Sequence, residues 1–555
     1  MNLTPLRCRL FSLQGSHYAI LLGLLTLLAA GLRLYKLGDY PGGFGQDEAV
    51  VTYDAWSLLT TGREHHGEWW PVNMRQFGDY CPGATTYLTV PFVAVFGPTI
   101  LAARLVCALL NVAAVPFFGL LASRLFRSRS IGVFAAALLA VSPWSIYFSR
   151  WATNACFVTF FQVTALWMLH RLLTEPEGRA RSYGRAVAVG VVLFLWTHEY
   201  LSQYLFAPFL IGVGLLLWWR GNRSRVFVTG GVYVLCMLAA AIARLRIPAA
   251  DGRLHHDSIL FLKHPLSDFC YNYWVCYAYS FLFTNRLMRP LHQIPGMAHI
   301  SHYLAPLFVL GLLVLAAALL WPRKLLRVLR CPDTPEEASH WRRSALWVAA
   351  WLALAPISNA LFVQHMYTAR LTHLLVGVLL VIALGCLAVW RLLRRLPYGA
   401  ARIASLGFVA AFALYLGQQA VHTGRALVRA NPFFKYYLQY GLPEVMRYLA
   451  AQPNVKTVRF DYLHQAYIYH LLFTPVPPSS VDYAEVSPTL PTSGEKWKYT
   501  KVDKVGNYTF NQSLDPKVVA QNATLRHQVR DSDGVWFDLY EKDGNWTVLL
   551  RAKVP

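Results

Sequence analysis

Seven carboxylates fall within one polar stretch of an otherwise apolar chain. Residues 38–85 contain Asp39, Asp47, Glu48, Asp54, Glu64, Glu68 and Asp79. A carboxylate beside a lipid bilayer is costly, so a group of them needs a functional reason. At a membrane surface such a group can act as a general base, taking a proton from an acceptor hydroxyl as it attacks an electrophile. The stretch therefore predicts chemistry on a membrane-associated substrate.

The Asp47-Glu48 pair follows a Pro-Gly-Gly-Phe-Gly-Gln turn just outside the first apolar segment. Acidic residues also favour the first turn of a helix, and the following AVVTYDAWSLLTTG is typical of one. Both interpretations are compatible, with Glu48 capping the helix and Asp47 projecting toward substrate. Asp79 stands just before a short apolar run that we expect along the membrane interface. It could bind a cation or orient a hydroxyl, or it could form an Asx-turn before Pro82.

Three arginines map to the same side of the membrane as these acids. Arg104 lies within an apolar segment, Arg150 ends one in SPWSIYFSR, and Arg370 stands in QHMYTARLTHLL. A guanidinium binds phosphate through two parallel hydrogen bonds. The alternative is that each arginine extends to the lipid headgroups. All three arginines lie on the same side of the membrane as the acid pair. This favours the interpretation that they bind one shared anionic ligand.

His198-Glu199-Tyr200 is expected at a tight external turn between the fifth and sixth apolar segments, where it can contact substrate. His255, His256, Asp257, His264 and Asp268 populate a later external loop. Histidines beside carboxylates suggest a metal, but no HxH or HExxH spacing is present. Nine cysteines show no spacing typical of zinc sites either. The sequence therefore leaves open whether the protein binds a divalent cation, and it assigns no ligands to one.

The elements that position these residues are membrane helices. The chain has 555 residues, of which 56% are hydrophobic and 14% charged, whereas soluble proteins have about a quarter charged. Eleven apolar runs have the length of a membrane-spanning helix. They cover residues 18–37, 99–122, 131–148, 154–173, 186–201, 203–219, 226–243, 303–321, 344–362, 367–390 and 403–422.

The net charge of +23 reports orientation rather than a nucleic-acid partner. The stretch from Asn431 is almost neutral, with 14 Lys and Arg against 12 Asp and Glu. The excess lies in alternate short loops, all on one side, which the positive-inside rule makes cytoplasmic. The N-terminus is then inside, and the external loops 38–98 and 244–302 face outside. The first apolar run could instead be a signal peptide, but it is long and lacks a small-residue cleavage site.

The chain divides into two predicted domains. Residues 1–430 form an all-α polytopic membrane domain, and residues 431–555 form a small extracytoplasmic α/β domain. The second part has short apolar runs broken by Pro, Asp and Gly, and an amphipathic helix, PEVMRYLAAQ, leads into it. We interpret it as a lid or acceptor-docking module rather than a second catalytic domain.

An ordered series of motifs carries a family resemblance. It runs RLYKLGDYPGGFGQDEAVVTYDAWSLLTTG, GEWWPV, GDYCPGATTYLTVPFVAVFG, AARLVCALLNVAAV and SPWSIYFSR, over roughly residues 30–160. The series resembles the GT-C class of polyprenyl-phosphate-sugar-dependent glycosyltransferases, above all the bacterial relatives of protein O-mannosyltransferases and the aminoarabinose transferase that modifies lipid A.

The resemblance implies an integral membrane enzyme of the bacterial inner membrane that transfers a sugar with inversion. Its partners would be a polyprenyl-phosphate sugar donor, membrane lipids, and an acceptor protein, lipid or glycan, with no nucleic acid. Asp47 matches the catalytic base, Glu48 its neighbour and Asp79 a second acid. Arg150 and Arg370 match positions that look like donor-phosphate contacts.

Two departures narrow the acceptor, and two alternatives remain. Tyr80-Cys81 stands where the lipid A enzymes have Lys-Pro, which puts modification of lipid A in doubt, and the WWDYG motif of oligosaccharyltransferases is missing. A transporter or flippase would also use many helices and buried arginines, but such proteins commonly have internal repeats, and none is evident. A non-catalytic scaffold would leave the Asp-Glu pair unexplained.

Overall fold

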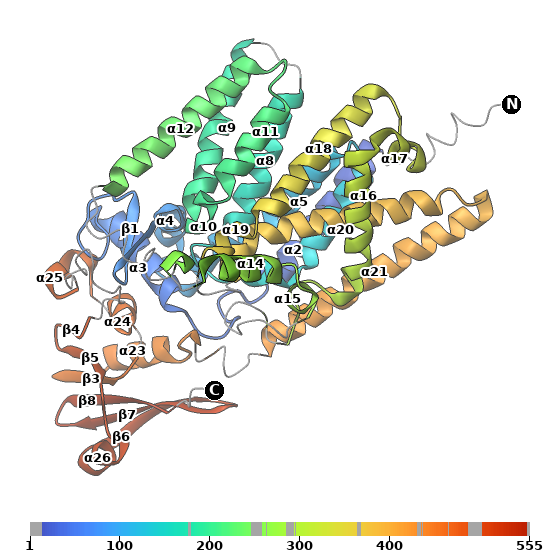
Figure 1. Cartoon of the computed structure of the whole chain (residues 1–555). Helices are drawn as coiled ribbons and strands as arrows, with labels where there is room; N and C mark the ends of the chain where they lie inside the picture. Colours follow the sequence, from blue (N-terminus) through green and yellow to red (C-terminus); the bar gives the residue numbers. More distant parts are fainter. Residues whose placement is uncertain are drawn as a thin grey trace.

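A helical bundle with a sheet-containing domain at one end makes up the molecule (Figure 1). The computed structural model describes residues 14–175, 179–245, 258–261, 264–284, 294, 296–362, 368–429, 435, 437–463, 465–474, 476–486 and 502–551. The bundle and the C-terminal sheet match the predicted fold class, an all-α membrane domain followed by a small α/β domain.

Long apolar helices build the bundle. Six are long and apolar enough to cross a membrane within the described ranges: α2 (Gly15–Leu34), α5 (Ile100–Leu125), α12 (Arg223–Leu245), η3 with α16 (His302–Leu320), η4 with α20 (Thr368–Leu393) and α21 (Tyr398–Val428). The bent pair α6 (Arg129–Val141) and α7 (Pro143–Ser149) would make a seventh. Further helices of the bundle are α8 (Val158–Thr174), α9 (Arg179–Glu199), α10 (Leu201–Tyr204), α11 (Ala207–Leu217), α17 (Pro322–Val328), α18 (Pro335–Leu354) and α19 (Ile357–Ala360).

All eleven expected spans fall on helices, but three are not continuous. The expected span 131–148 breaks between α6 and α7, which meet at an angle of 59°. Pro143 causes the break, because proline lacks the N–H that would continue the helix and its ring clashes with the preceding turn. Residues 203–219 divide between α10 and α11, and residues 344–362 between α18 and α19. The number of membrane crossings stays a prediction.

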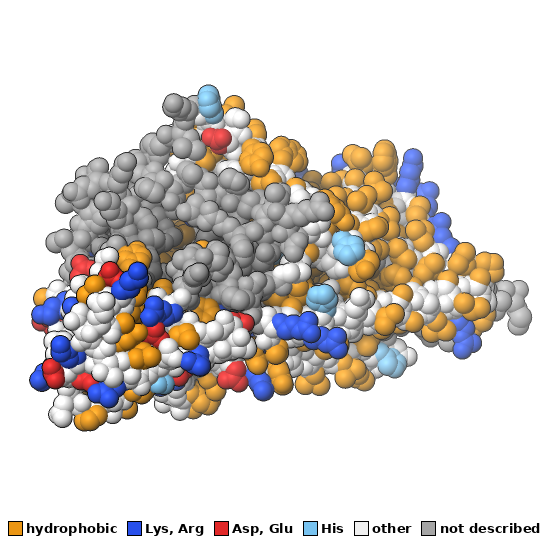
Figure 2. Space-filling view, turned by 90° about the horizontal axis from the view of Figure 1, so that it is seen from below, with side chains coloured by type: hydrophobic (Ala, Val, Ile, Leu, Met, Phe, Trp, Pro, Cys, Tyr) orange, Lys and Arg blue, Asp and Glu red, His pale blue; other side chains and the backbone are white. Residues whose placement is uncertain are grey.

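Helix α20 forms the centre of the bundle, and α21 lies at its edge. The apolar window of α20 is 94% buried, whereas that of α21 is 0% buried. Glycines allow α16 and α20 to cross closely, since a Cβ on Gly311 would lie 1.9 Å from the Val381 carbonyl oxygen. Seen from below, apolar side chains cover the region of α21, and charged side chains gather over the C-terminal domain (Figure 2). The exposed apolar surface of α21 is what a lipid-facing helix requires.

The polar loop after α2 folds into one helix and a hairpin. Helix α3 spans Gln46–Thr61, and strands β1 (Asn73–Gln76) and β2 (Asp79–Pro82) pair antiparallel with Gln76 opposite Asp79. Phe77 and Gly78, which join the strands, both have positive φ, as a type I′ turn demands. Helix α4 (Ala84–Phe96) then returns the chain to the bundle. Loop 244–302 contains η1 (Ile259–Phe261), α14 (Pro265–Val275) and α15 (Tyr279–Leu282).

The C-terminal domain is a six-stranded mixed sheet with short helices. Its strands follow the order β4-β5-β3-β8-β7-β6, and β3 runs parallel to both β5 and β8. The strands are β3 (Thr457–Asp461), β4 (Lys504–Val505), β5 (Tyr508–Gln512), β6 (Thr524–Asp531), β7 (Gly534–Lys542) and β8 (Asn545–Leu550). The helices are α23 (Leu442–Ala450), α24 (Tyr467–Phe473), η5 (Pro478–Ser480), α25 (Tyr483–Val486) and α26 (Pro516–Asn522).

The amphipathic helix predicted at the start of this domain is α23, and with α24 it lies between the sheet and α3 (Figure 1). The predicted domain boundary at 430/431 lies outside the described residues.

Candidate active site

Glu48 is the fixed point of the acidic loop. Its side chain is fully buried and accepts a hydrogen bond from the Gly45 backbone N–H at 2.9 Å, which is the glutamate half of a capping box at the start of α3. Arg104 of α5 binds both of its oxygens, at 2.8 and 3.0 Å. The Ala152 backbone N–H donates a further bond at 3.2 Å. Glu48 therefore caps α3, as the capping interpretation of the sequence expects, and its predicted place among the catalytic residues stays a prediction.

Arg104 also holds the turn that precedes α3. Its terminal nitrogens donate to the carbonyl oxygens of Pro41 at 3.0 Å and Gly43 at 2.7 Å, with a longer bond of 3.3 Å to that of Leu37. The guanidinium is fully buried. A guanidinium carries five N–H donors, so Arg104 can bind Glu48 and the backbone of the turn at the same time. It therefore holds the turn and the acid in a fixed relation.

Arg150 binds the backbone at the end of α2. It donates to the carbonyl oxygen of Arg33 at 2.9 Å and to those of Tyr35 and Tyr40 at 2.8 Å, with longer bonds to Leu32 and Lys36. The last carbonyl groups of a helix lack hydrogen-bond donors within the helix, and Arg150 supplies donors to those of α2. A phosphate contact by Arg150 or Arg104 would have to replace these bonds, and their donor-binding roles stay predictions.

The C-terminal domain closes over the same turn. The Phe44 backbone N–H donates to the Leu438 carbonyl oxygen at 2.7 Å, and the Tyr469 hydroxyl donates to the Phe44 carbonyl oxygen at 2.5 Å. Gly43 has φ +92°, and a Cβ there would lie 2.7 Å from the Leu438 oxygen. A glycine is therefore required where the two chain segments meet.

Asp47 occupies the first turn of α3 beside this framework, and its side chain is half-buried. Burial, and then the carboxylates of Glu48 and Asp47, raise the pKa of the Tyr469 hydroxyl well above its usual range. Tyr469 therefore stays protonated near Asp47. Of the three predicted site acids, Asp47 is the one with partial solvent access, which a base that meets an acceptor hydroxyl needs.

Asp79 and Arg370 lie in separate elements. Asp79 is buried at the start of β2, where one carboxylate oxygen accepts from the Tyr80 backbone N–H at 2.9 Å. Arg370 is buried in η4 (Thr368–Leu371), with its guanidinium 4.2 Å from the ring centroid of Phe362. This stacking is typical of a cation–π contact. The roles of both residues remain predictions.

His198 and Glu199 form the last turn of α9, and Tyr200 lies at the expected break between α9 and α10. Glu199 is fully buried, and His198 stacks on Phe194 with ring centroids 5.1 Å apart. Tyr200 is half-buried. The side chains at this helix junction are therefore largely packed within the protein. Whether these residues bind substrate stays a prediction. His255, His256 and Asp257 lie outside the described residues.

Three residues that hold this site have no sequence signal of their own. The guanidinium of Arg33 donates to the Leu139 and Ala140 carbonyl oxygens at 3.0 and 2.9 Å, and so caps α6. Tyr469 and Leu438 reach the turn from the C-terminal domain. An arginine near a helix end is common, so only the tertiary structure identifies Arg33. The contacts of Tyr469 and Leu438 join residues about 400 positions apart, and no local pattern predicts such contacts.

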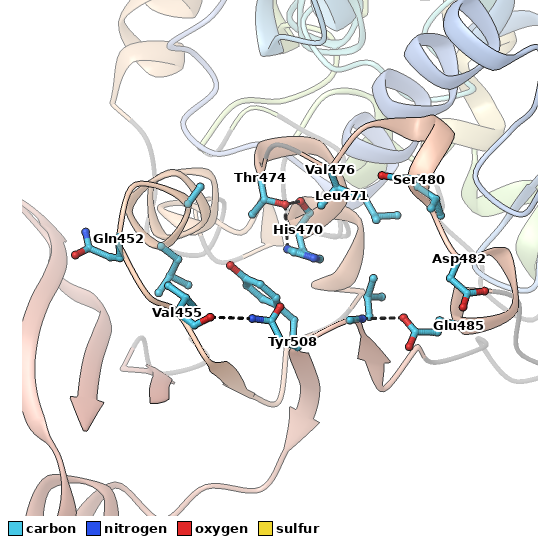
Figure 3. Close-up of a pocket in the computed structure, with 16 residues that line it drawn as sticks. Gln452, Val455, His470, Leu471, Thr474, Val476, Ser480, Asp482, Glu485 and Tyr508 are labelled. Carbon is cyan, nitrogen blue, oxygen red and sulfur yellow. Dashed lines mark hydrogen bonds between the residues drawn. The ribbon is translucent and has the colours of Figure 1, made fainter. Parts of the chain in front are cut away.

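A separate pocket lies wholly within the C-terminal domain (Figure 3). Its volume is about 460 Å³, and no predicted site residue lines it. His470 stacks on Tyr508 with ring centroids 3.7 Å apart, and Thr474 bonds to the His470 ring. Burial lowers the pKa of His470 to about 3, so its imidazole is neutral. Asp482 and Glu485 lie on the opposite wall (Figure 3).

Comparisons with known proteins define the fold. Residues 82–245 match the family model described as dolichyl-phosphate-mannose-protein mannosyltransferase, which is 164 of 555 residues. An oligosaccharyltransferase from Archaeoglobus fulgidus, crystallised with a tethered acceptor peptide, superposes with a TM-score of 0.50 at 13% identity. The alignment covers 83% of this chain and 64% of that one. The chain therefore shares the overall fold of this oligosaccharyltransferase, and it spans less than two thirds of that protein's length.

The chain is also similar to ArnT from Cupriavidus metallidurans, crystallised with undecaprenyl phosphate. That TM-score is 0.46 at 14% identity, covering 83% of this chain and 86% of that one. No curated protein sequence matches the chain. Its apolar helices and its fold identify an integral membrane protein. The transporter alternative gains no support from these comparisons. The family model begins at Pro82 and so leaves out Asp47, Glu48 and Asp79.

Proposed function

We propose that the protein is an inverting glycosyltransferase that moves a sugar from a polyprenyl-phosphate donor to an acceptor hydroxyl. The observation that carries the proposal is the placement of Asp47. A half-buried carboxylate stands at the start of α3, while its neighbour Glu48 is locked by Arg104 and the backbone. One acid is rigid and the other accessible, which is the arrangement that a positioned base requires.

In the proposed reaction, Asp47 takes the proton of the acceptor hydroxyl. The acceptor oxygen attacks the anomeric carbon of the sugar from the face opposite the phosphate. The bond between that carbon and the phosphate oxygen breaks, and the polyprenyl phosphate leaves with the bonding electrons. Inversion at the anomeric carbon follows from the single displacement.

The leaving phosphate requires positive charge nearby, because negative charge develops on it in the transition state. We assign this role to Arg370, whose position the family resemblance matches to a donor-phosphate contact. The Phe362 ring, whose centroid lies 4.2 Å from the guanidinium carbon, packs against the group and limits its movement. Arg104 and Arg150 instead hold the turn that carries Asp47, since their donors bind Glu48 and backbone carbonyls.

The donor lipid and the acceptor define where the reaction occurs. A sugar attached to a polyprenyl phosphate stays in the bilayer, so α3 must lie at the membrane surface. We assign α3 and the C-terminal domain to the outer side of a bacterial inner membrane and the N-terminus to the inner side; the concentration of basic residues in alternate loops supports this orientation. The acceptor is a hydroxyl of a protein, lipid or envelope glycan.

Transfer of radiolabelled sugar tests the proposal. The purified protein in lipid receives several polyprenyl-phosphate sugars, with native membranes as the source of acceptor. We expect the wild type to label an acceptor and Asp47→Asn to lose transfer by at least about 100-fold, the size of a general-base contribution. Asp39→Asn, an exposed acid of the same loop, is the matched control and should retain activity. Full activity of Asp47→Asn would refute the base assignment.

A second outcome bears on the function as a whole. If no donor sugar is transferred while the labelled lipid itself crosses the bilayer, the protein moves the lipid and is not a transferase. Donor binding by Asp47→Asn is measured as a rise in its unfolding temperature when the donor is added. A variant that binds the donor but does not transfer sugar has lost the chemistry and not the fold.

A further inference from the structure

A buried cluster of metal-binding side chains lies just beyond the C-terminal end of α3. Glu64, His65 and His66 are consecutive, and a turn closed by the Gly67 backbone N–H and the Glu64 carbonyl oxygen, 2.9 Å apart, brings them together. Glu64 and His65 are fully buried, and His66 is 8% exposed. Buried imidazole and carboxylate groups in one turn are unlike a solvated surface cluster.

The donor atoms of the cluster are close enough to share one ion. One ligand atom from each of Glu64, His65 and His66 lies within 4.8 Å of the others. The two imidazole rings have centroids 3.9 Å apart. The Asp54 carboxylate of α3 lies 2.7 Å from Nδ1 of His65, a hydrogen-bond distance, so it orients the ring. Ligand atoms about 2.0–2.2 Å from a tetrahedral zinc ion stand about 3.4 Å from one another, so the donors of Glu64, His65 and His66 would draw together around the ion.

Two carboxylate oxygens in the cluster lack a hydrogen-bond donor among the residues that the structure describes. They are Oδ2 of Asp54 and Oε2 of Glu64, both buried. A buried hydrogen-bond acceptor without a donor destabilises the folded protein, because it has lost its hydration and gained no partner. Oε2 of Glu64 lies 3.4 Å from Nδ1 of His65, and the other oxygen of Asp54, Oδ1, lies 2.7 Å from the same nitrogen, so both carboxylates face one imidazole. Arg75 is the nearby cation and acts on His65 and His66 at longer range.

His65 is oriented by a partner for each ring nitrogen. Nδ1 faces Asp54, and Nε2 lies 3.2 Å from the Tyr467 hydroxyl of α24. A histidine that binds a metal through one nitrogen normally has the other nitrogen held by a hydrogen bond. Whichever nitrogen meets the ion, the remaining one keeps such a partner.

We propose that Glu64, His65 and His66 bind one zinc ion, with Asp54 orienting the His65 ring. Two imidazoles and a carboxylate suit zinc better than calcium or magnesium, which prefer all-oxygen sites. Because the donors are buried, the ion has a structural role. Asp54 follows Asp47 by two helical turns, about 10 Å along the axis, so the ion fixes the far end of α3 and, through Tyr467, the C-terminal domain.

Metal analysis of the full-length protein tests this site independently of transferase activity. The protein is purified without a polyhistidine tag, stripped with a chelator and dialysed against zinc chloride alone. We expect about one tightly held zinc per chain and a higher unfolding temperature than in the stripped protein. Glu64→Gln and His66→Gln should lose the zinc. His302→Gln, which removes an exposed histidine elsewhere, should keep it.

Cobalt substitution makes the test independent of how the variants fold. Cobalt added to the stripped wild type should give the visible absorption of a tetrahedral site with nitrogen and oxygen ligands, and zinc should displace it. Zinc that is substoichiometric in the wild type, or equally abundant in Glu64→Gln and the wild type, would overturn the proposal. In that case the cluster is an ion-pair network of His65 with Asp54.

Discussion

The hydroxyl of Tyr469 donates a 2.5 Å hydrogen bond to the backbone carbonyl oxygen of Phe44. Phe44 lies two residues before α3, and Tyr469 belongs to α24 of the C-terminal domain. The turn that carries Asp47 is therefore built from both domains. The Leu438 carbonyl oxygen binds the Phe44 N–H, so both polar backbone groups of Phe44 bond to the C-terminal domain.

Tyr469→Phe should slow transfer while leaving donor binding intact. The substitution removes one hydrogen bond worth about 0.5–1.5 kcal/mol, so we expect turnover to fall about 2- to 10-fold with little change in KM for the donor. Steady-state kinetics with the labelled donor measure both constants. Tyr303→Phe, at an exposed tyrosine of η3, should match the wild type. A rise in KM with unchanged turnover would contradict a role in positioning Asp47.

Breaking the Glu48–Arg104 pair should destabilise the protein more than any surface substitution. Removal of one partner from a buried ion pair costs about 3–5 kcal/mol, because the other charge is left uncompensated. We expect Glu48→Gln to lower the unfolding temperature in detergent, measured by tryptophan fluorescence. Arg104→Lys should do the same, since a lysine cannot bind both oxygens of Glu48 in parallel. Wild-type stability in both variants would show that the pair contributes little.

Gly43→Ala should disrupt the contact between the domains. A Cβ at Gly43 would lie 2.7 Å from the Leu438 carbonyl oxygen, and the positive φ adds strain of about 1–2 kcal/mol. Gly221→Ala is the matched control, because φ is +86° there and no atom lies within 4 Å of the new Cβ. We expect faster hydrogen exchange at residues 38–46 in Gly43→Ala only. Equal effects of the two substitutions would assign the loss to φ strain alone.

His470 should make the C-terminal domain sensitive to acid. Burial lowers the pKa of His470 from 6.5 to about 3, so below pH 6.5 the unfolded state binds a proton that the folded state excludes. Stability then falls as the pH drops from about 6.5 toward 3, by about 2 kcal/mol at pH 5. Hydrogen exchange of α24 and β5 at pH 7 and pH 5, corrected for intrinsic rates, measures the loss.

The matched variant for this prediction is His470→Phe, which retains an aromatic ring against Tyr508 and should show a smaller difference between the two pH values. His422→Gln, at an exposed position of α21, should retain the wild-type difference. If His470→Phe responds to pH as the wild type does, other groups control the acid response.

The sequence predicted the helical bundle, the C-terminal α/β domain and the capping role of Glu48. Apolar runs and an acid in the first turn of a helix are local patterns, and each follows from a few adjacent residues. Pro143 could have indicated the break between α6 and α7. The apolar composition of residues 131–148 instead led us to expect one continuous helix. The packing of His198 and Glu199 depends on the path of α10, which no local pattern specifies.

The arginines show where prediction from residue type stops. Arg104 and Arg150 were expected at a phosphate, which stays a prediction; in this structure their donors bind Glu48 and backbone carbonyls. A guanidinium binds carbonyl, carboxylate and phosphate oxygens with similar geometry. An arginine in the sequence therefore predicts a group of oxygen acceptors, but not whether they belong to a phosphate, a carboxylate or the backbone. Only the fold shows which acceptors the arginine binds.

The bond from the Phe44 N–H to the Leu438 carbonyl oxygen sets an order of events during synthesis. When the first helices enter the bilayer, the ribosome has not yet made the segment that secures the turn before Asp47. The nascent protein would hold its membrane helices without the completed turn before Asp47 until Leu438 and Tyr469 have emerged. We expect ribosome-bound intermediates that lack these residues to be inserted yet inert, and transfer to become possible once the chain through Tyr469 has emerged.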